Sequence, residues 1–177
     1  MNQKEVSTEA LSLNSIVLKV LARVEADGFN RASFDLDLDP ELPPVRGNRL
    51  QVEKVLINLI ENSIEAMHDA SLGSRPIAVM VRTAADEALA QVTVTDSGPG
   101  IDKQTLHRIF DPFFTTRLGQ GGSGLGLHVV FSLVVDLLGG RIDVDSSPGL
   151  GAIFIVRLPV VAPQPKAKPA GKEEEGE

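Results

Sequence analysis

The chain has 177 residues, a hydrophobic fraction of 42% and a formal net charge of −7, which excludes disorder through its middle. The acidic balance and the lack of a basic stripe argue against nucleic acid as a partner and against direct contact with an anionic membrane. No apolar run approaches the ~20 residues of a membrane span. Because cysteine is absent, disulfides and thiolate metal sites are excluded, and we expect a cytoplasmic domain.

We expect a flexible segment at 1–9, one folded domain at 10–159 and a disordered tail at 160–177. The tail consists almost entirely of Pro, Ala, Lys and Glu and cannot bury a core. In the folded part, Ala10 to Leu13 is compatible with a short edge strand. Asn14 is the expected N-cap of a helix that ends at Asp27-Gly28. Alternating apolar residues then predict a strand at 34–38 with one wet face.

The strongest predicted helix runs from Asn48 to about Ala70 and has two distinct faces. Apolar residues and one serine share the first face, namely Val52, Leu56, Leu59, Ser63 and Met67. The second face carries Asn58, Asn62, Glu65 and Asp69. Such a polar stripe is ordinary solvated surface in most helices, but amide oxygens are also suitable ligands for Mg²⁺.

The rest of the chain alternates between strands and glycine-rich connections. Strands are predicted at 77–82 and 88–95 around a turn at Asp86-Glu87, and again at 141–145 and 152–158. Between them lies a long loop at 97–122 with one short helix at 103–109, a length that is typical of functional loops. A helix at 124–138 is apolar nearly all round, so we expect it to be deeply buried or covered by a partner.

Three stretches of this loop region carry the chemistry. Asp96-Ser97-Gly98-Pro99-Gly100 is either a simple turn or a strand-end carboxylate that accepts from the amine of adenine. Gly122 to Gly126 is either a flexible helix entry or a phosphate-binding turn, although it is neither a Walker A loop nor a dinucleotide fingerprint. Three phenylalanines at 110, 113 and 114 are either core or an exposed contact surface.

Taken together, the chain resembles the catalytic and ATP-binding domain of sensor histidine kinases, in the superfamily of DNA gyrase and the mismatch-repair ATPases. The motifs that carry the resemblance are an asparagine box at 51–63, glycine boxes at 96–101 and 122–127, and a phenylalanine box at 110–117. The resemblance spans roughly Leu11 to Pro159. It implies the Bergerat fold, an α/β (α+β) two-layer sandwich in which a mixed, mostly antiparallel sheet is covered on one face by three helices.

The resemblance also implies a Mg²⁺–ATP site and the roles of its residues. Asn58 and Asn62 would hold the metal, Asp96 would bind adenine, and Arg117 would be a cation near the γ-phosphate. The nucleotide would further contact Asn62, Glu65, Gly98, Gly100, Ile101, Thr115, Thr116, Gly122, Ser123, Gly124, Leu125, Gly126 and Leu127. Loop residues 118–122 would need a bound triphosphate to become ordered.

Several positions depart from the family pattern. Ala152 replaces the usual threonine, Glu65 a frequent lysine, and Asn48 a frequent aspartate. Relatives that hydrolyse ATP carry a glutamate base at the position of Asn58, and an amide cannot take that proton. This exchange favours a kinase over an ATPase.

None of His68, His107 and His128 fits the family's phosphoacceptor motif. We therefore expect the acceptor histidine on a separate helical hairpin, with a response regulator downstream. Two alternatives stay open. One is a regulatory ATP-binding module without transfer activity, and the other is a serine kinase of the anti-sigma type.

Overall fold

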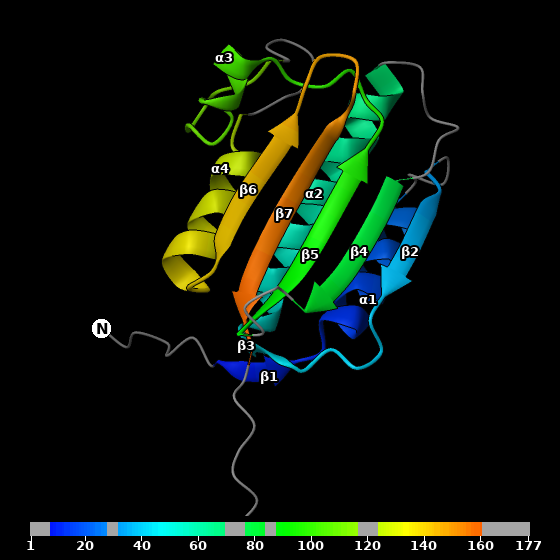
Figure 1. The fold of residues 1–177 in the computed structure, drawn as a ribbon, viewed down its shortest axis with the longest axis vertical. Helices are drawn as coiled ribbons and strands as arrows, with labels where there is room; N and C mark the ends of the chain where they lie inside the picture. The colour runs from blue at the N-terminus through cyan, green and yellow to red at the C-terminus, as the bar shows by residue number, and fades with distance from the viewer. Residues whose placement is uncertain (1–7, 28–31, 70–76, 84–87, 117–123, 161–177) are drawn as a thin grey trace, which may run out of the picture.

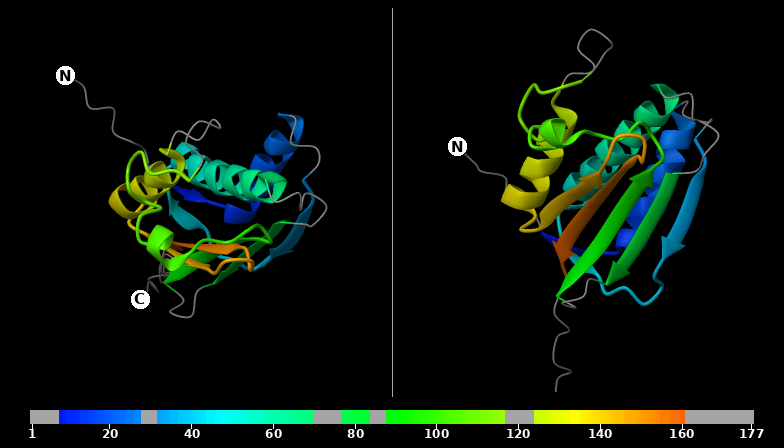
Figure 2. Two further views of the ribbon diagram at one scale, coloured as in Figure 1. Left: turned by 90° about the horizontal axis from the view of Figure 1, so that it is seen from above. Right: turned by 45° about the horizontal axis from the view of Figure 1, so that its top comes forward.

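The structure is a computed structural model that describes residues 8–27, 32–69, 77–83, 88–116 and 124–160. It forms two layers, in which a twisted sheet carries its helices on one face and leaves the other face open (Figures 1 and 2). This arrangement confirms the predicted two-layer sandwich. The predicted turn at 86–87 and most of the two terminal segments lie outside the described residues. Within the described part, no helix combines the length and the apolar character needed to span a bilayer.

The main sheet has five strands in the order β2-β4-β5-β7-β6, and only the β2–β4 pair is parallel. A small antiparallel sheet pairs β1 with β3. The strands are β1 (Glu9–Leu11), β2 (Phe34–Leu38), β3 (Val45–Gly47), β4 (Ile77–Thr83), β5 (Leu89–Asp96), β6 (Arg141–Ser146) and β7 (Ala152–Pro159). Strand β3 was not predicted, because three residues are too few to show an alternating pattern.

Alternation along β5 and β7 sets the inner face of the sheet. In β5 every second residue is buried, and the last of these is Asp96. In β7 the same alternation buries Ala152, Phe154, Val156 and Leu158. Asp96 and Ala152 are paired directly opposite each other in the antiparallel register. The period of two therefore turns a carboxylate and a methyl group toward the helical layer at one end of the sheet.

Helix α1 (Leu13–Ala26) begins two residues earlier than predicted. Its N-cap is Ser12, whose side chain accepts from the backbone N–H of Ser15 at 3.3 Å. Asn14 is not the cap, since its Nδ2 donates to the carbonyl of Asp39 at 2.7 Å and ties the helix to the loop after β2. The C-terminal end is as predicted, with the N–H of Asp27 bonded to the carbonyl of Arg23.

Helix α2 (Arg49–Asp69) crosses the inner face of the sheet between α1 and the C-terminal helix (Figure 2). The predicted apolar face is buried, with Val52, Leu56, Leu59, Ser63 and Met67 all at most 2% exposed. The side chain of Asn48 caps its N-terminus by accepting from the N–H of Gln51. An ion pair between Lys19 and Glu53, with 2.8 Å between Nζ and Oε1, joins α1 to α2.

The helix predicted at 124–138 differs from the expectation in two respects. It consists of α4 (Gly126–Phe131) followed directly by a π-helical segment η1 (Ser132–Leu137), in which the N–H of Leu138 bonds to the carbonyl of Leu133. It is also not deeply buried, because only one side packs on α2 and β6 while Phe131, Val135 and Leu137 are 37%, 37% and 62% exposed. The other expectation, that a partner covers this helix, stays a prediction. The apolar residues of this helix exceed what one packed face can cover.

The short helix α3 (Lys103–Leu106) ends three residues earlier than predicted. Asp102 caps its start by accepting from the N–H groups of Gln104 and Thr105 at 2.9 Å. Beyond it, the N–H of Arg108 bonds to the carbonyl of Thr105, and that of Asp111 to the carbonyl of Arg108. These bonds span three residues instead of four, so the chain continues in tight turns.

The turn between β6 and β7 offers a matched pair of glycines for a stability test. Gly149 and Gly151 both have positive φ, at 81° and 76°. A Cβ at Gly149 would meet nothing within 4 Å, whereas a Cβ at Gly151 would overlap the backbone carbonyl of Asp96. We expect Gly149→Ala to cost about 1–2 kcal/mol from backbone strain alone, and Gly151→Ala to cost clearly more. Urea denaturation of both variants checks this, and equal losses would contradict the close approach.

Candidate functional site

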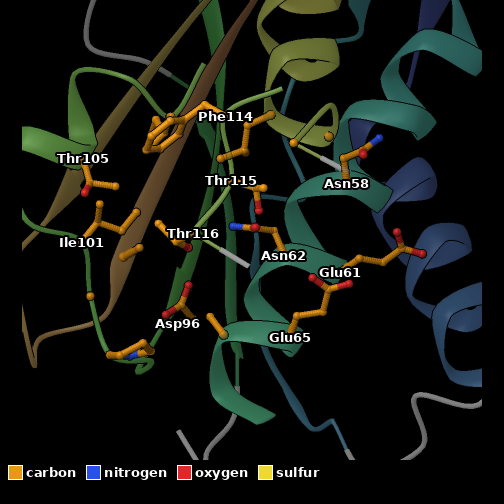
Figure 3. A pocket seen from close by; sticks show the side chains of 18 of the residues that line it. Asn58, Glu61, Asn62, Glu65, Asp96, Ile101, Thr105, Phe114, Thr115 and Thr116 are labelled. Carbon is orange, nitrogen blue, oxygen red and sulfur yellow. The ribbon is translucent and has the colours of Figure 1, made fainter. Parts of the chain in front are cut away.

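The site is a pocket of about 550 Å³ at the end of the sheet where β5 and β7 meet the middle of α2. Its opposite wall is the segment that follows β5, and the start of α4 closes one side (Figure 3). Most of the predicted site residues line it, namely Asn58, Asn62, Glu65, Asp96, Gly100, Ile101, Thr115, Thr116, Gly124, Gly126 and Leu127. The tertiary fold thus gathers residues from distant parts of the chain, from Asn58 on α2 to Ala152 on β7.

Other predicted residues are placed differently. Gly98 lies behind the pocket wall, and Leu125 precedes α4 with 36% of its surface exposed, so neither lines the pocket. Arg117, Gly122 and Ser123, together with the loop expected to order at 118–122, lie outside the described residues. Their predicted roles therefore stay predictions.

The pocket also contains residues to which the sequence analysis assigned no role. They are Glu61, Ala66, Pro99, Asp102, Thr105 and Ile109. Helical spacing could have found two of them, because Glu61 lies three positions after Asn58 and Ala66 four positions after Asn62. The other four are in the connection after β5, where no periodicity shows which side chains turn inward.

Asp96 is the most buried acid of the pocket, with 3% of its surface exposed. One carboxylate oxygen, Oδ1, accepts from the backbone N–H of Gly98 at 2.8 Å and so closes the turn after β5. Gly98 must lie close, since a Cβ there would come within 3.1 Å of the Cβ of Ala66 on α2. In Figure 3 the carboxylate faces the pocket from the end of its strand. It is an acceptor held at a fixed place in a partly apolar wall.

Burial raises the pKa of Asp96 above its ordinary value. The N–H of Gly98, the hydroxyl of Ser63 and the N–H of Ala152 act in the opposite direction and lower the pKa, in that order of size. These groups only partly replace the water that the carboxylate loses. A ligand that donates a hydrogen bond here would complete its solvation.

Asn58 and Asn62 enter the pocket from one side of α2. The Nδ2 of Asn58 donates to the carbonyl of Lys54 at 2.8 Å, which directs its Oδ1 toward the first turn of α4. A Cβ at Gly126 would lie 3.1 Å from that oxygen. Asn62 faces Thr116 across the pocket in Figure 3. The oxygen of Asn58 therefore lies beside the start of α4, and the amide of Asn62 extends toward the opposite wall.

The charge of the pocket is one-sided. Glu61, Glu65, Asp96 and Asp102 contribute carboxylates, and no lysine or arginine is among the described lining residues. Burial raises the pKa of Glu61 most, and the neighbouring charge of Glu65 raises it further. A polyphosphate could enter such a pocket only with cations that neutralise it. This donor set, made of amide and carboxylate oxygens, fits a hard divalent cation such as Mg²⁺.

The three phenylalanines of the connection have different environments. Phe113 is 73% exposed with a positive φ of 64°, so it points away from the protein, as predicted for a contact surface. Phe114 does not join it, because it lines the pocket and lies under the guanidinium of Arg108, 4.6 Å from its centroid. Phe110 packs on Phe131 of α4 with 5.5 Å between ring centroids.

The pocket thus combines a strand-end carboxylate, a helix that carries two amides and a helix start with two glycines, all within a two-layer sandwich. The family described as "Histidine kinase-, DNA gyrase B-, and HSP90-like ATPase" matches residues 47–162. The chain belongs to this family.

Its relatives identify the branch. The chain is 42% identical over 130 residues to the alginate biosynthesis sensor protein KinB of Pseudomonas aeruginosa, covering 73% of this chain and 21% of that protein. It is 35% identical over 153 residues to the sensor histidine kinase ZraS of Klebsiella oxytoca, covering 86% and 31%. The chain thus spans about a fifth to a third of these proteins.

Solved structures agree with this assignment. The nucleotide-free catalytic domain of the histidine kinase ThkA superposes with a TM-score of 0.74 at 30% identity, covering 87% of this chain and 96% of that one. Full-length ShkA in complex with AMPPNP has the same fold, with a TM-score of 0.76 at 21% identity over 92% of this chain and 33% of that one. The chain is therefore a catalytic domain of the histidine kinase type.

The burial of Asp96 leads to a test that separates stability from function. Its raised pKa means that folding disfavours the ionised form of Asp96. The stability of the fold therefore falls as the pH rises from the ordinary pKa of an aspartate to the raised pKa of Asp96, and the loss is complete above it. At pH 7 the neutral variant Asp96→Asn should therefore unfold at the same or a higher temperature than the wild type, while losing nucleotide affinity. Thermal unfolding without nucleotide and ADP titration check the two effects. A strongly destabilised variant would contradict the first.

Proposed function

We propose that this domain binds Mg²⁺–ATP in the pocket and donates the γ-phosphate to a histidine on a helical hairpin outside residues 8–160. The observation that carries the proposal is the buried carboxylate of Asp96 opposite the two amides of α2. An ionised acceptor suits the exocyclic amine of adenine and not the carbonyl at the same position of guanine. The whole pathway would be that of a two-component sensor, with a response regulator as the final acceptor.

In this proposal Asn62, supported by Asn58, holds the metal beside the phosphates. The Mg²⁺ would neutralise the negative charge of the phosphates. The described lining of the pocket cannot do so, because it contains four carboxylates and no lysine or arginine. Gly124 lets the phenylalanine segment pack against the start of α4, because a Cβ there would be 2.5 Å from the backbone of Phe113. Gly126 leaves Oδ1 of Asn58 uncovered, because a Cβ there would lie 3.1 Å from that oxygen. Arg117 and the segment 118–123 would complete the phosphate site. Positioning and charge neutralisation are then the main contributions to transfer.

The transfer acceptor is proposed to dock near Phe113. This side chain is the most exposed aromatic in the described residues, and it lies next to Phe114, which lines the nucleotide pocket. An apolar side chain held outward beside the reactive end of a nucleotide site is suited to contact a partner. Its strained φ of 64° shows that the surrounding backbone imposes this orientation.

The metal role is tested with Asn62→Ala. We expect Mg²⁺-dependent ATP affinity to fall at least tenfold, about the loss of a ligand interaction worth 1.4 kcal/mol, with unchanged unfolding temperature. The matched control is Gln51→Ala, which removes an amide from the same helix outside the pocket and should bind ATP normally. Isothermal titration with and without Mg²⁺ measures both. Equal affinity of Asn62→Ala and wild type would refute the assignment.

Phosphotransfer is tested by supplying a phosphoacceptor hairpin in trans with radiolabelled ATP. The domain should label the hairpin and show almost no label on itself, since none of its own histidines fits the acceptor motif. Phe113→Ala should lower the transfer rate more than ATP affinity, because it alters the docking surface. The control is Leu50→Ala, which truncates a side chain of similar exposure, 72%, at the far end of α2.

The outcome also distinguishes the alternatives. ATP binding without transfer to any hairpin would favour a regulatory module, an alternative to which Ala152 and Glu65 in the pocket lend some weight. Label that is stable to acid on a serine of a partner would indicate a serine kinase. Acid-labile label on this chain itself would make His68, His107 or His128 an acceptor and would contradict the proposed division between two domains.

A further inference from the structure

The hydroxyl of Ser63 is a buried polar group that has no hydrogen-bond partner of normal geometry. Ser63 is 0% exposed, and its Oγ makes no hydrogen bond within the described residues. Only one other side-chain atom shares this state there, Oδ1 of Asn14, which is far from the pocket. A buried hydroxyl without a partner is unfavourable compared with an alanine of similar size. Its presence on the core face of α2 therefore needs an explanation.

The position of Ser63 points to Asp96. Ser63 lies one helical turn before Ala66, whose Cβ faces Gly98 at the turn after β5. Gly98 in turn donates to Oδ1 of Asp96 at 2.8 Å. The hydroxyl of Ser63 acts on the same carboxylate, lowering its pKa without making a hydrogen bond of normal geometry. Ser63 thus lies behind Asp96, on the side of α2.

On the strand beside Asp96, a backbone group acts on the carboxylate, the N–H of Ala152, but no side chain does. Ala152 is the residue paired with Asp96 on β7, it is 5% exposed, and it lines the pocket. Its side chain is a methyl group, so it cannot donate to the carboxylate or hold a water molecule. Of Ser63 on the helix and Ala152 on the sheet, only Ser63 has a side-chain hydroxyl.

We propose that Ser63 is a positioning residue of the base site, whose hydroxyl orients the carboxylate of Asp96 toward the amine of a bound aminopurine. This inference rests on the proposed nucleotide function. Oδ1 is held by the N–H of Gly98, and the O–H of Ser63 is available for the second oxygen when a ligand closes the pocket. The carboxylate is then fixed at both oxygens, and its free lone pair is directed at the base.

Ser63→Ala tests the proposal by base discrimination. The probes are Mg²⁺–ADP and the diphosphate of purine riboside, which has the same phosphates but lacks the exocyclic amine. Isothermal titration should show that Ser63→Ala lowers the affinity for ADP about three- to tenfold, as expected for the loss of one hydrogen bond. The affinity for the amine-free nucleotide should change less than twofold. The ratio of the two affinities, ADP over the amine-free diphosphate, should therefore become smaller in Ser63→Ala.

A matched pair of second-site variants provides the rescue. In the Ser63→Ala background, Ala152→Thr places a hydroxyl on the sheet beside Asp96 and should restore most of the discrimination. Ala152→Val has the same shape without the hydroxyl and should not restore it. Ser63→Cys, which keeps the volume with a weak donor, serves as a second variant if the alanine variant unfolds early, and should also lose discrimination.

The possible failures are distinguishable. If Ser63→Ala weakens both nucleotides equally, or if valine rescues as well as threonine, Ser63 acts through packing and the inference is wrong. Unchanged ADP affinity in Ser63→Ala would overturn it as well. If the wild-type domain binds neither nucleotide, the proposed function itself fails.

Discussion

Helix α2 has to pack its apolar face on the inner face of the sheet while its adjacent face lines a polar pocket, and the rest of the site depends on this double role. Val52, Leu56 and Leu59 are buried against the sheet and α1, which fixes the rotation of the helix about its axis. Once that rotation is fixed, Asn58 and Asn62 can only point to the side where β5 ends. The placement of the two amides is therefore a consequence of core packing, and a shift of one residue in the helix pattern would remove the proposed metal site.

The sheet supplies the second constraint through the pairing of β5 with β7. Alternation along β5 ends on Asp96, so the strand that builds the core also delivers a carboxylate to its edge. The close approach of Gly151 to the carbonyl of Asp96 holds this end of the strand in place. Burying the carboxylate is unfavourable without a ligand, as its raised pKa shows. In the proposed function this unfavourable group has a use, because an acceptor fixed in advance is suited to select a base.

The connection between β5 and α4 is assembled from short local contacts. Asp102 caps α3, Arg108 covers the ring of Phe114, and Nδ1 of His128 lies 3.0 Å from the carbonyl of Phe110, linking α4 to the phenylalanine segment. Phe110 and Phe114 pack against the core, whereas the polar side chains of these contacts are partly or fully exposed. The polar contacts can therefore rearrange when a ligand or partner arrives without disturbing the sheet.

The sequence by itself determined the elements with strong periodicity and the family. The two faces of α2, the alternation of β5 and β7 and the four motifs could be read directly, because each depends on spacing within one short segment. It missed β3 and the early end of α3, because these elements are too short to show a pattern. It also missed the N-cap at Ser12, because the side chain of Asn14 bonds to the carbonyl of Asp39 instead of capping the helix. Only the tertiary structure decided that Phe114 turns into the pocket while Phe113 turns out, and that Ser63 and Ala152 both lie beside Asp96. These relations join residues that are distant in the chain. They are determined by burial and by pairing between elements, and no local spacing in the sequence encodes either.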